Sequence, residues 1–202
     1  MSSPARHTFE EREILVVEAA TLLFSNHGFV GTTTKMIAEA AQVNEALIFR
    51  HFPKKEDLYT AIIELKLKEW VENVIPALEK TLSMDLEPAL LEIAQVMVRE
   101  NKKDPTCLKM MLFSALENHA LSRMFFQKRL PLIEFLEKFF KKQMKVGNTR
   151  LLKSDEVARA FLSMVHHYIL VSQLFDSGLY FKKKESSVLK SFVDIFVKGV
   201  SA

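Results

Sequence analysis

Two short helical segments separated by three residues lie near the N-terminus, and they restrict the fold more than any other part of the sequence. Apolar spacing and capping residues predict one helix over Thr33–Ala41 and a second over Glu45–His51, with a break at residues 42–44. Pro53 disfavours helical geometry at the preceding residue and so ends the second helix. A pair of helices joined in this way is typical of a helix-turn-helix.

Small and apolar side chains allow these two helices to pack together. Ala38 and Ala41 permit a close approach, and the shared core is expected to contain Ile37, Val43, Ile48 and Phe52. The second helix is about 10 Å long, which suits a major groove about 12 Å wide. With Ile48 buried, positions 45, 46 and 50 point away from the core, and 46 and 50 share one face.

The rest of the chain also has helical periodicity. Five Gly and six Pro in 202 residues are too few turn residues for an all-β chain. The further predicted helices are Thr8–His27 with Gly28 as its C-cap, Lys55–Leu82 with a kink or interruption before Pro76, Leu86–Lys102, Pro105–Asn118, Leu121–Lys145 kinked or split by Pro131, Ser154–Ser177 and Glu185–Val200. We therefore predict an all-α fold of about nine helices. A three-helix domain over residues 1–54, with the helix-turn-helix at about 33–52, is joined by the long helix to a helical domain over 55–202.

Composition excludes several classes of protein. Cys107 is the only cysteine, so neither an intramolecular disulfide nor a cysteine-based zinc site is expected. The polar start of the chain has no signal-peptide pattern, and no apolar run reaches the roughly 18 residues of a membrane helix, so we expect a cytoplasmic protein. His166 and His167 diverge by about 100° on one helix and predict no metal site. No nucleophile elbow, P-loop or dinucleotide turn is present, so we expect neither an enzyme nor a cofactor.

Net charge gives no argument for DNA binding. The isoelectric point is about 8.9. Residues 1–60 nevertheless hold six Lys and Arg against eight Asp and Glu. The local pattern of residues must therefore carry the argument.

That pattern, GFVGTTTKMIAEAAQVNEALIFRHFPKKEDL over residues 28–58, resembles the signature of the tetracycline-repressor (TetR) family. The matching residues are Gly28, Phe29, Thr32, Thr33, Ile37, Ala38, Ala41, Val43, His51, Phe52, Lys55, Glu56 and Leu58. Four positions depart from the family pattern. Gln42 replaces the turn glycine and is expected to be strained. Ala46 replaces Gly and stiffens the helix, Asn44 replaces Ser as a cap, and Phe49 replaces a Tyr that would bind phosphate.

The resemblance implies that the second helix reads DNA. Thr33 and the free N–H groups beside it would hold a phosphate, and His51 and Lys55 match phosphate contacts of the family. Arg50 is the best candidate for a guanine contact. Thr34 and Lys35 would reach base or backbone. Glu45 would accept from cytosine or repel phosphate, and Leu47 would touch a thymine methyl or be partly buried. The predicted DNA-binding set is Thr33, Thr34, Lys35, Asn44, Glu45, Ala46, Leu47, Arg50, His51 and Lys55.

The resemblance further implies an effector pocket among the central helices, which are rich in Met and Phe. An apolar or amphipathic small molecule is expected there. The predicted pocket set is Met97, Met110, Phe113, Asn118, Met124, Phe125, His166 and Tyr168. Ordinary core packing is the alternative role for each of these residues.

The last two predicted helices are the most apolar, and the resemblance implies that they pair with their counterparts in a homodimer. The predicted interface set is Phe161, Val165, Ile169, Phe192, Ile195 and Phe196. Closure of the chain's own core is the alternative.

Together these features predict a repressor that binds a palindromic double-stranded operator and is released by its effector. Two other interpretations stay open. One is a regulator with no inducer pocket, and the other is a helical carrier or sensor of apolar ligands that no longer binds DNA.

Overall fold

A computed structural model of the chain describes residues 9–128, 130–175 and 184–202, and within these ranges it contains helices and no strand. The prediction of an all-α fold is confirmed. No helix in the described ranges is both long and apolar enough to cross a membrane. The chain forms two compact units, one of residues 1–67 with 106–126 and the other of residues 68–105 with 127–202.

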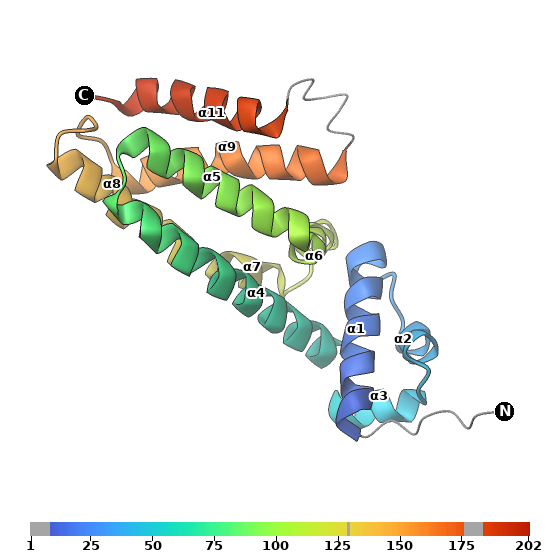
Figure 1. The fold of residues 1–202 in the computed structure, drawn as a ribbon. Coiled ribbons are helices and arrows are strands. Elements are labelled where there is room, and N and C mark those ends of the chain that lie inside the picture. The colour runs from blue at the N-terminus through green and yellow to red at the C-terminus, as the bar shows by residue number, and fades with distance from the viewer. Residues whose placement is uncertain (1–8, 129, 176–183) are drawn as a thin grey trace. The chain divides into compact units, whose positions relative to one another are not determined.

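The first unit contains the helix-turn-helix. It is built from α1 (Phe9–His27), α2 (Thr34–Ala41), α3 (Glu45–His51), the first part of α4 (Lys55–Glu79) and α6 (Thr106–Leu116). α1 packs against α2, α3 and α6, and the ribbon of Figure 1 shows α3 following α2 after a short turn. The core of this unit includes Phe24, Ile37, Ile48, Tyr59 and Met110.

Local chemistry fixes the ends of these short helices. Gly28 ends α1 with a left-handed φ of 72°, as predicted. The Thr33 side chain caps α2 by accepting from the Met36 N–H, and the Asn44 side chain caps α3 by accepting from the Ala46 N–H. Gln42 has φ 54° and ψ 41°, so the strain expected from a non-glycine residue in this turn is confirmed.

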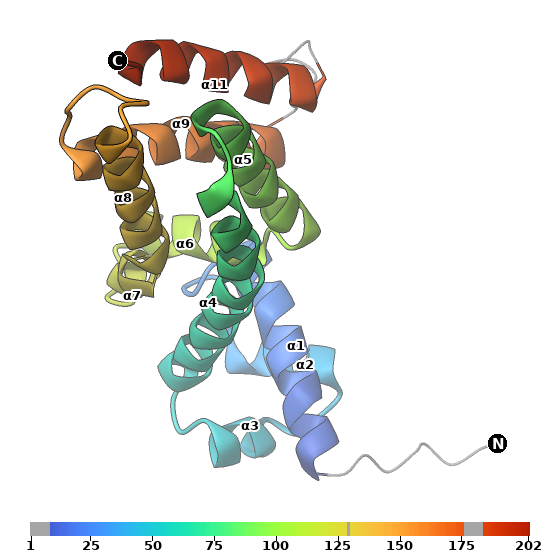
Figure 2. The same cartoon turned by 60° about the vertical axis from the view of Figure 1, so that its left-hand side comes forward.

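The second unit is a helical body. It contains the rest of α4, a 3-10 turn η1 (Lys80–Ser83), α5 (Leu86–Lys103), α8 (Leu130–Lys145), α9 (Ser154–Leu174) and α11 (Glu185–Val200). α9 packs against α8 and α5, and α5 also packs against α11 (Figure 2). The core side chains of this unit include Ile93, Met97, Leu136, Phe139 and Phe161.

Two prolines act differently from each other in these helices. Pro76 lies inside α4, which continues to Glu79, so the helix is not interrupted before that proline. The predicted Leu121–Lys145 helix is divided into α7 (Ser122–Lys128) and α8, and Pro131 is the second residue of α8. A proline is tolerated there because N–H groups in the first turn have no partner within the helix. The predicted break at Ser177 and Gly178 lies outside the described residues.

Candidate DNA-binding surface

The outer face of α3 carries the side chains that the sequence assigned to DNA reading. Ile48 is buried in the core of the unit, whereas Ala46 and Arg50 are exposed and Glu45 is half-buried. Because Ala46 and Arg50 lie one turn apart, they form one continuous strip on the helix. This strip opens onto a surface hollow that Asn44 and Leu47 also line.

Arg12 of α1 lines the same hollow as Arg50 and was missed by sequence reasoning. The two guanidinium groups therefore come from different helices to one side of the unit. In the sequence, Arg12 lies among three acidic residues, so the local charge pattern does not indicate that it lies near α3. These residues are Glu10, Glu11 and Glu13. Arg12 is brought to this side by the packing of α1 against α3, a tertiary contact that the sequence pattern does not indicate.

Glu45 connects the two helices of the motif. Its Oε1 accepts a hydrogen bond from the Thr34 hydroxyl, which lies at the start of α2. The carboxylate therefore has a partner within the unit, and one oxygen fewer is available to a cytosine. Lys35, in the first turn of α2, is exposed.

The two predicted phosphate contacts His51 and Lys55 have partners within the unit. The His51 side chain is 9% exposed, and its Nδ1 lies 3.3 Å from Oε2 of Glu13. The Lys55 ammonium donates to the carbonyl oxygens of Phe29 and Thr32, both at 2.8 Å. A phosphate contact would compete with these bonds, so both roles stay predictions.

Lys55 also lies over the Phe29 ring, with its Nζ 4.1 Å from the ring centroid. Burial lowers the pKa of Lys55, and the negative charges of Glu56 and Glu117 act in the opposite direction. Lys55 therefore fixes the loop between α1 and α2, a role that its position in a phosphate-binding motif did not indicate.

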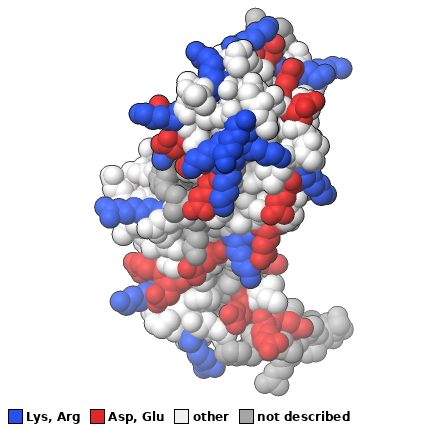
Figure 3. All heavy atoms as spheres, turned by 90° about the vertical axis from the view of Figure 1, so that its left-hand side faces the viewer, with Lys and Arg blue, Asp and Glu red and all other residues white. Residues whose placement is uncertain are grey.

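Charge alone does not distinguish a DNA-binding surface on the face of the molecule that Figure 3 shows. On the face drawn in Figure 3, Lys and Arg side chains are interspersed with Asp and Glu. Among the described residues no group of three or more His, Cys, Asp or Glu is arranged to hold a metal ion.

The predicted pocket residues are divided between the two units. Met110, Phe113, Asn118, Met124 and Phe125 belong to the first unit, and Met97, His166 and Tyr168 belong to the second. Met97, Met110 and Phe125 are fully buried in the cores of their units, which matches the core-packing alternative. Asn118 lines a surface hollow at the turn after α6, together with His119 and Arg123. The effector pocket stays a prediction.

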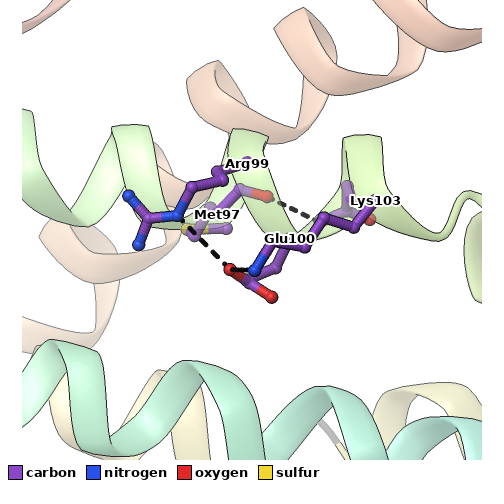
Figure 4. A network of polar contacts seen from close by, with 5 residues as sticks. Met97, Arg99, Glu100 and Lys103 are labelled. Atoms are coloured by element: carbon purple, nitrogen blue, oxygen red, sulfur yellow. Dashed lines mark hydrogen bonds and ion pairs between the residues drawn. The ribbon is translucent and has the colours of Figure 1, made fainter.

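A polar network lies near the C-terminal end of α5 in the second unit (Figure 4). Oε1 of Glu100 accepts from Nε of Arg99 at 3.3 Å and from Nζ of Lys103 at 2.7 Å. The hydrogen bond from Lys103 is the main reason that the pKa of Glu100 is lowered. Arg99 is therefore paired with Glu100 on its own helix.

Tyr168, another predicted pocket residue, also has its hydrogen-bond partner within the second unit. It is buried, its hydroxyl donates to Oε2 of Glu185 at 3.4 Å, and Glu185 forms an ion pair with Lys102. Burial, with the charge of Glu185, raises the pKa of Tyr168 to about 12.

The predicted interface residues fall into two groups. Phe161, Val165 and Ile169 of α9 are at most 1% exposed, so they belong to the core of the second unit and have no surface left for a partner. The Phe161 ring lies 5.3 Å from that of Phe196. On α11, Ile195 is 66% exposed, and Phe192 and Phe196 are half-buried. The alternative that α9 closes the core of its own chain therefore accounts for the first group.

Comparison with known proteins agrees with this arrangement. Residues 16–62 match the family model described as bacterial regulatory proteins, tetR family. The chain is 30% identical over 193 residues to the HTH-type transcriptional regulator YvkB of Bacillus subtilis (strain 168). This match covers 93% of the chain and 96% of YvkB.

Solved structures with similar folds cover nearly the whole chain. The TetR family transcriptional regulator PfmR from Thermus thermophilus is 22% identical, covers 91% of this chain and 97% of its own, and has a TM-score of 0.64. AibR in complex with isovaleryl coenzyme A and operator DNA is 19% identical, covers 95% and 98%, and has a TM-score of 0.66. At these identities the likeness shows the fold.

Proposed function

Because the chain belongs to the TetR family of bacterial transcriptional regulators, we propose that it is a repressor that binds a palindromic DNA operator as a homodimer. An apolar or amphipathic small molecule would release it, and no catalytic role forms part of this proposal. It would act in the cytoplasm, where its operator lies.

The exposed strip on α3 is the observation that carries the proposal. α3 is capped by Asn44, held to α2 through Thr34 and Glu45, and presents Arg50 to solvent. We assign base reading to Arg50, since a guanidinium can bind O6 and N7 of guanine together. Arg12 lines the same hollow from α1, and we assign it to a backbone phosphate.

We assign the dimer contact to α11. Phe192, Ile195, Phe196 and Gly199 follow one another at helical spacing, and Ile195 and Gly199 are exposed. Ile195 is an exposed apolar side chain, and Gly199, one turn later, carries no side chain. This part of α11 is therefore suited to close contact with a second copy. A dimer would present its two α3 helices to successive major grooves about 34–36 Å apart or at a longer spacing on the same duplex face.

The effector part of the proposal rests on the family and on the Met and Phe content of the central helices. AibR was solved with both isovaleryl coenzyme A and operator DNA, which supports a small-molecule effector for a protein of this fold. Release requires the effector to bind the DNA-free state more tightly than the DNA-bound state. A regulator with no inducer is the alternative, and thermal-shift screening of apolar compounds distinguishes the two.

The DNA-binding proposal is tested by comparing Arg50→Ala with Arg12→Ala on duplexes selected from a random library. Arg50→Ala is expected to relax preference at one base pair in each half-site and to weaken binding to the selected site by about 1–3 kcal/mol. Arg12→Ala should weaken binding to all sequences and reduce the salt dependence by about one phosphate contact.

Equal losses on all sequences for Arg50→Ala would make it a backbone contact. If the wild-type protein shows no salt-dependent binding to DNA at all, the repressor proposal fails, and the ligand carrier becomes the better description.

A further inference from the structure

The loop that leads into α2 is held by Glu117, which lies directly after α6. Oε2 of Glu117 accepts from the Phe29 N–H, and Oε1 accepts from the Val30 N–H, both at 3.1 Å. The two bonds use both carboxylate oxygens on consecutive backbone groups. Glu117 is 87 residues from Val30 in the sequence, and both belong to the first compact unit.

The end of α6 is built so that Glu117 points at this loop. Asn118 has a left-handed φ of 51°, and the His119 N–H donates to the Ser114 carbonyl at 2.9 Å, which is the hydrogen bond of a Schellman motif. A carboxylate at the C-terminal end of a helix is unfavourable because the helix dipole is negative there. Glu117 is stabilised at this position by the two N–H groups and by the nearby charge of Lys55.

The same loop is held from the other side by α4 and by aromatic packing. Lys55 binds the carbonyl oxygens of Phe29 and Thr32, and the Thr32 hydroxyl donates to the Gly28 carbonyl at 2.8 Å. The Phe29 ring lies 4.3 Å from the ring of His119 and 5.1 Å from that of Tyr59. The loop thus receives a negative group on its N–H side and a positive group on its carbonyl side.

Thr33, the N-cap of α2, follows this loop directly. We propose that Glu117 is a positioning residue for DNA binding, which fixes the loop from α6 and thereby sets the orientation of α2 and α3. The inference rests on the proposed DNA-binding function. It adds a residue outside the helix-turn-helix to those that determine operator affinity.

Glu117→Gln tests this role because it keeps the size of the side chain. The amide offers one oxygen and turns an NH₂ group toward the second N–H, so one of the two bonds is lost. Operator affinity is expected to fall roughly tenfold with an unchanged salt slope. Glu117→Asp keeps the charge but shortens the side chain by one methylene, and it should also weaken binding.

Glu18→Gln is the matched control, since Glu18 is an exposed carboxylate on α1 of the same unit. Removal of a negative charge alone favours DNA binding, so electrostatics and positioning predict opposite signs for Glu117→Gln. Wild-type affinity in both Glu117 variants, or equal effects of Glu117→Gln and Glu18→Gln, would overturn the proposal.

A measurement without DNA separates this inference from the proposed function. In Glu117→Gln the amide protons of Phe29 and Val30 should exchange at least tenfold faster, and the amide signals of residues 34–51 should shift. If the wild-type protein binds no DNA, the proposed function fails while these signals still test the contact. Unchanged signals beyond residue 32 would show that Glu117 does not position α2 and α3.

Discussion

Gln42 shows how one residue can hold a functional turn at a cost to stability. Its φ of 54° is common for glycine and unfavourable for a residue with a Cβ atom. The turn nevertheless closes, because the Gln42 N–H donates to Glu39 and the Val43 N–H donates to Ala38. The left-handed backbone brings α3 against α2 irrespective of the side chain at this position.

Gln42→Gly is therefore expected to stabilise the protein. Relief of the left-handed strain, about 1 kcal/mol, exceeds the additional unfolded-state entropy of glycine and leaves a net gain of about 0.5 kcal/mol. Thermal or urea unfolding measures the change. Gln42→Ala keeps the strain and serves as one control. Glu39→Gly, inside α2, should lower stability by about 1 kcal/mol. A loss of stability in Gln42→Gly would contradict the strain argument.

At the level of single residues, sequence predicted what depends on neighbours in the chain. The cap at Asn44 and the strain at Gln42 were foreseen because each depends on residues within four positions. The partners of His51 and Lys55 were not foreseen. They come from Glu13 and from the α1–α2 loop, so only tertiary structure brings them together.

Among the helices, α5 carries a charge network whose effect depends on pH. Glu100 is 10% exposed and accepts from Arg99 and Lys103, and its pKa is lowered from the ordinary value. A carboxyl group with a lowered folded-state pKa stabilises the protein above its unfolded-state pKa. This contribution is lost as the pH falls through the folded-state pKa.

Glu100→Gln should therefore destabilise the protein at pH 7 and destabilise it less near pH 3, below the ordinary pKa of a glutamate. The expected loss at pH 7 is about 1 kcal/mol or less, because both cationic partners are largely exposed. Urea unfolding at the two pH values measures it. Glu134→Gln, at an exposed position on α8, is the matched control. A loss of the same size at both pH values would mean that the charge of Glu100 is not responsible.

Helix boundaries followed well from periodicity, and α11 has the predicted limits Glu185–Val200. Periodicity did not, however, predict what each apolar face packs against. The apolar side chains of α9 have the same spacing whether a second chain or the chain's own α5, α8 and α11 cover them. The structure shows that Phe161, Val165 and Ile169 are covered within their own unit.

For the whole molecule, the assignment of the dimer contact to α11 is tested by Ile195→Asp. A charge in place of an Ile that becomes buried on association removes about 1.5–3 kcal/mol per side chain and adds a desolvation cost. The dimer dissociation constant should rise at least tenfold, as measured by light scattering or sedimentation. Leu151→Asp, at a position 89% exposed in the loop after α8, is the control. An Ile195→Asp variant that stays as dimeric as this control would place the contact elsewhere.

The first compact unit is assembled from two stretches of chain, because α6 covers Phe24, Phe29 and Tyr59 from beyond residue 105. A chimera intended to give this regulator the operator preference of a relative would therefore gain little from a junction at the end of α3 or at residue 67. Such a chimera would combine the relative's α1–α3 with the native α6. The α1–α2 loop of the relative would then no longer fit the Glu117 carboxylate. Exchange of operator specificity should succeed when residues 106–126 are replaced together with residues 1–67.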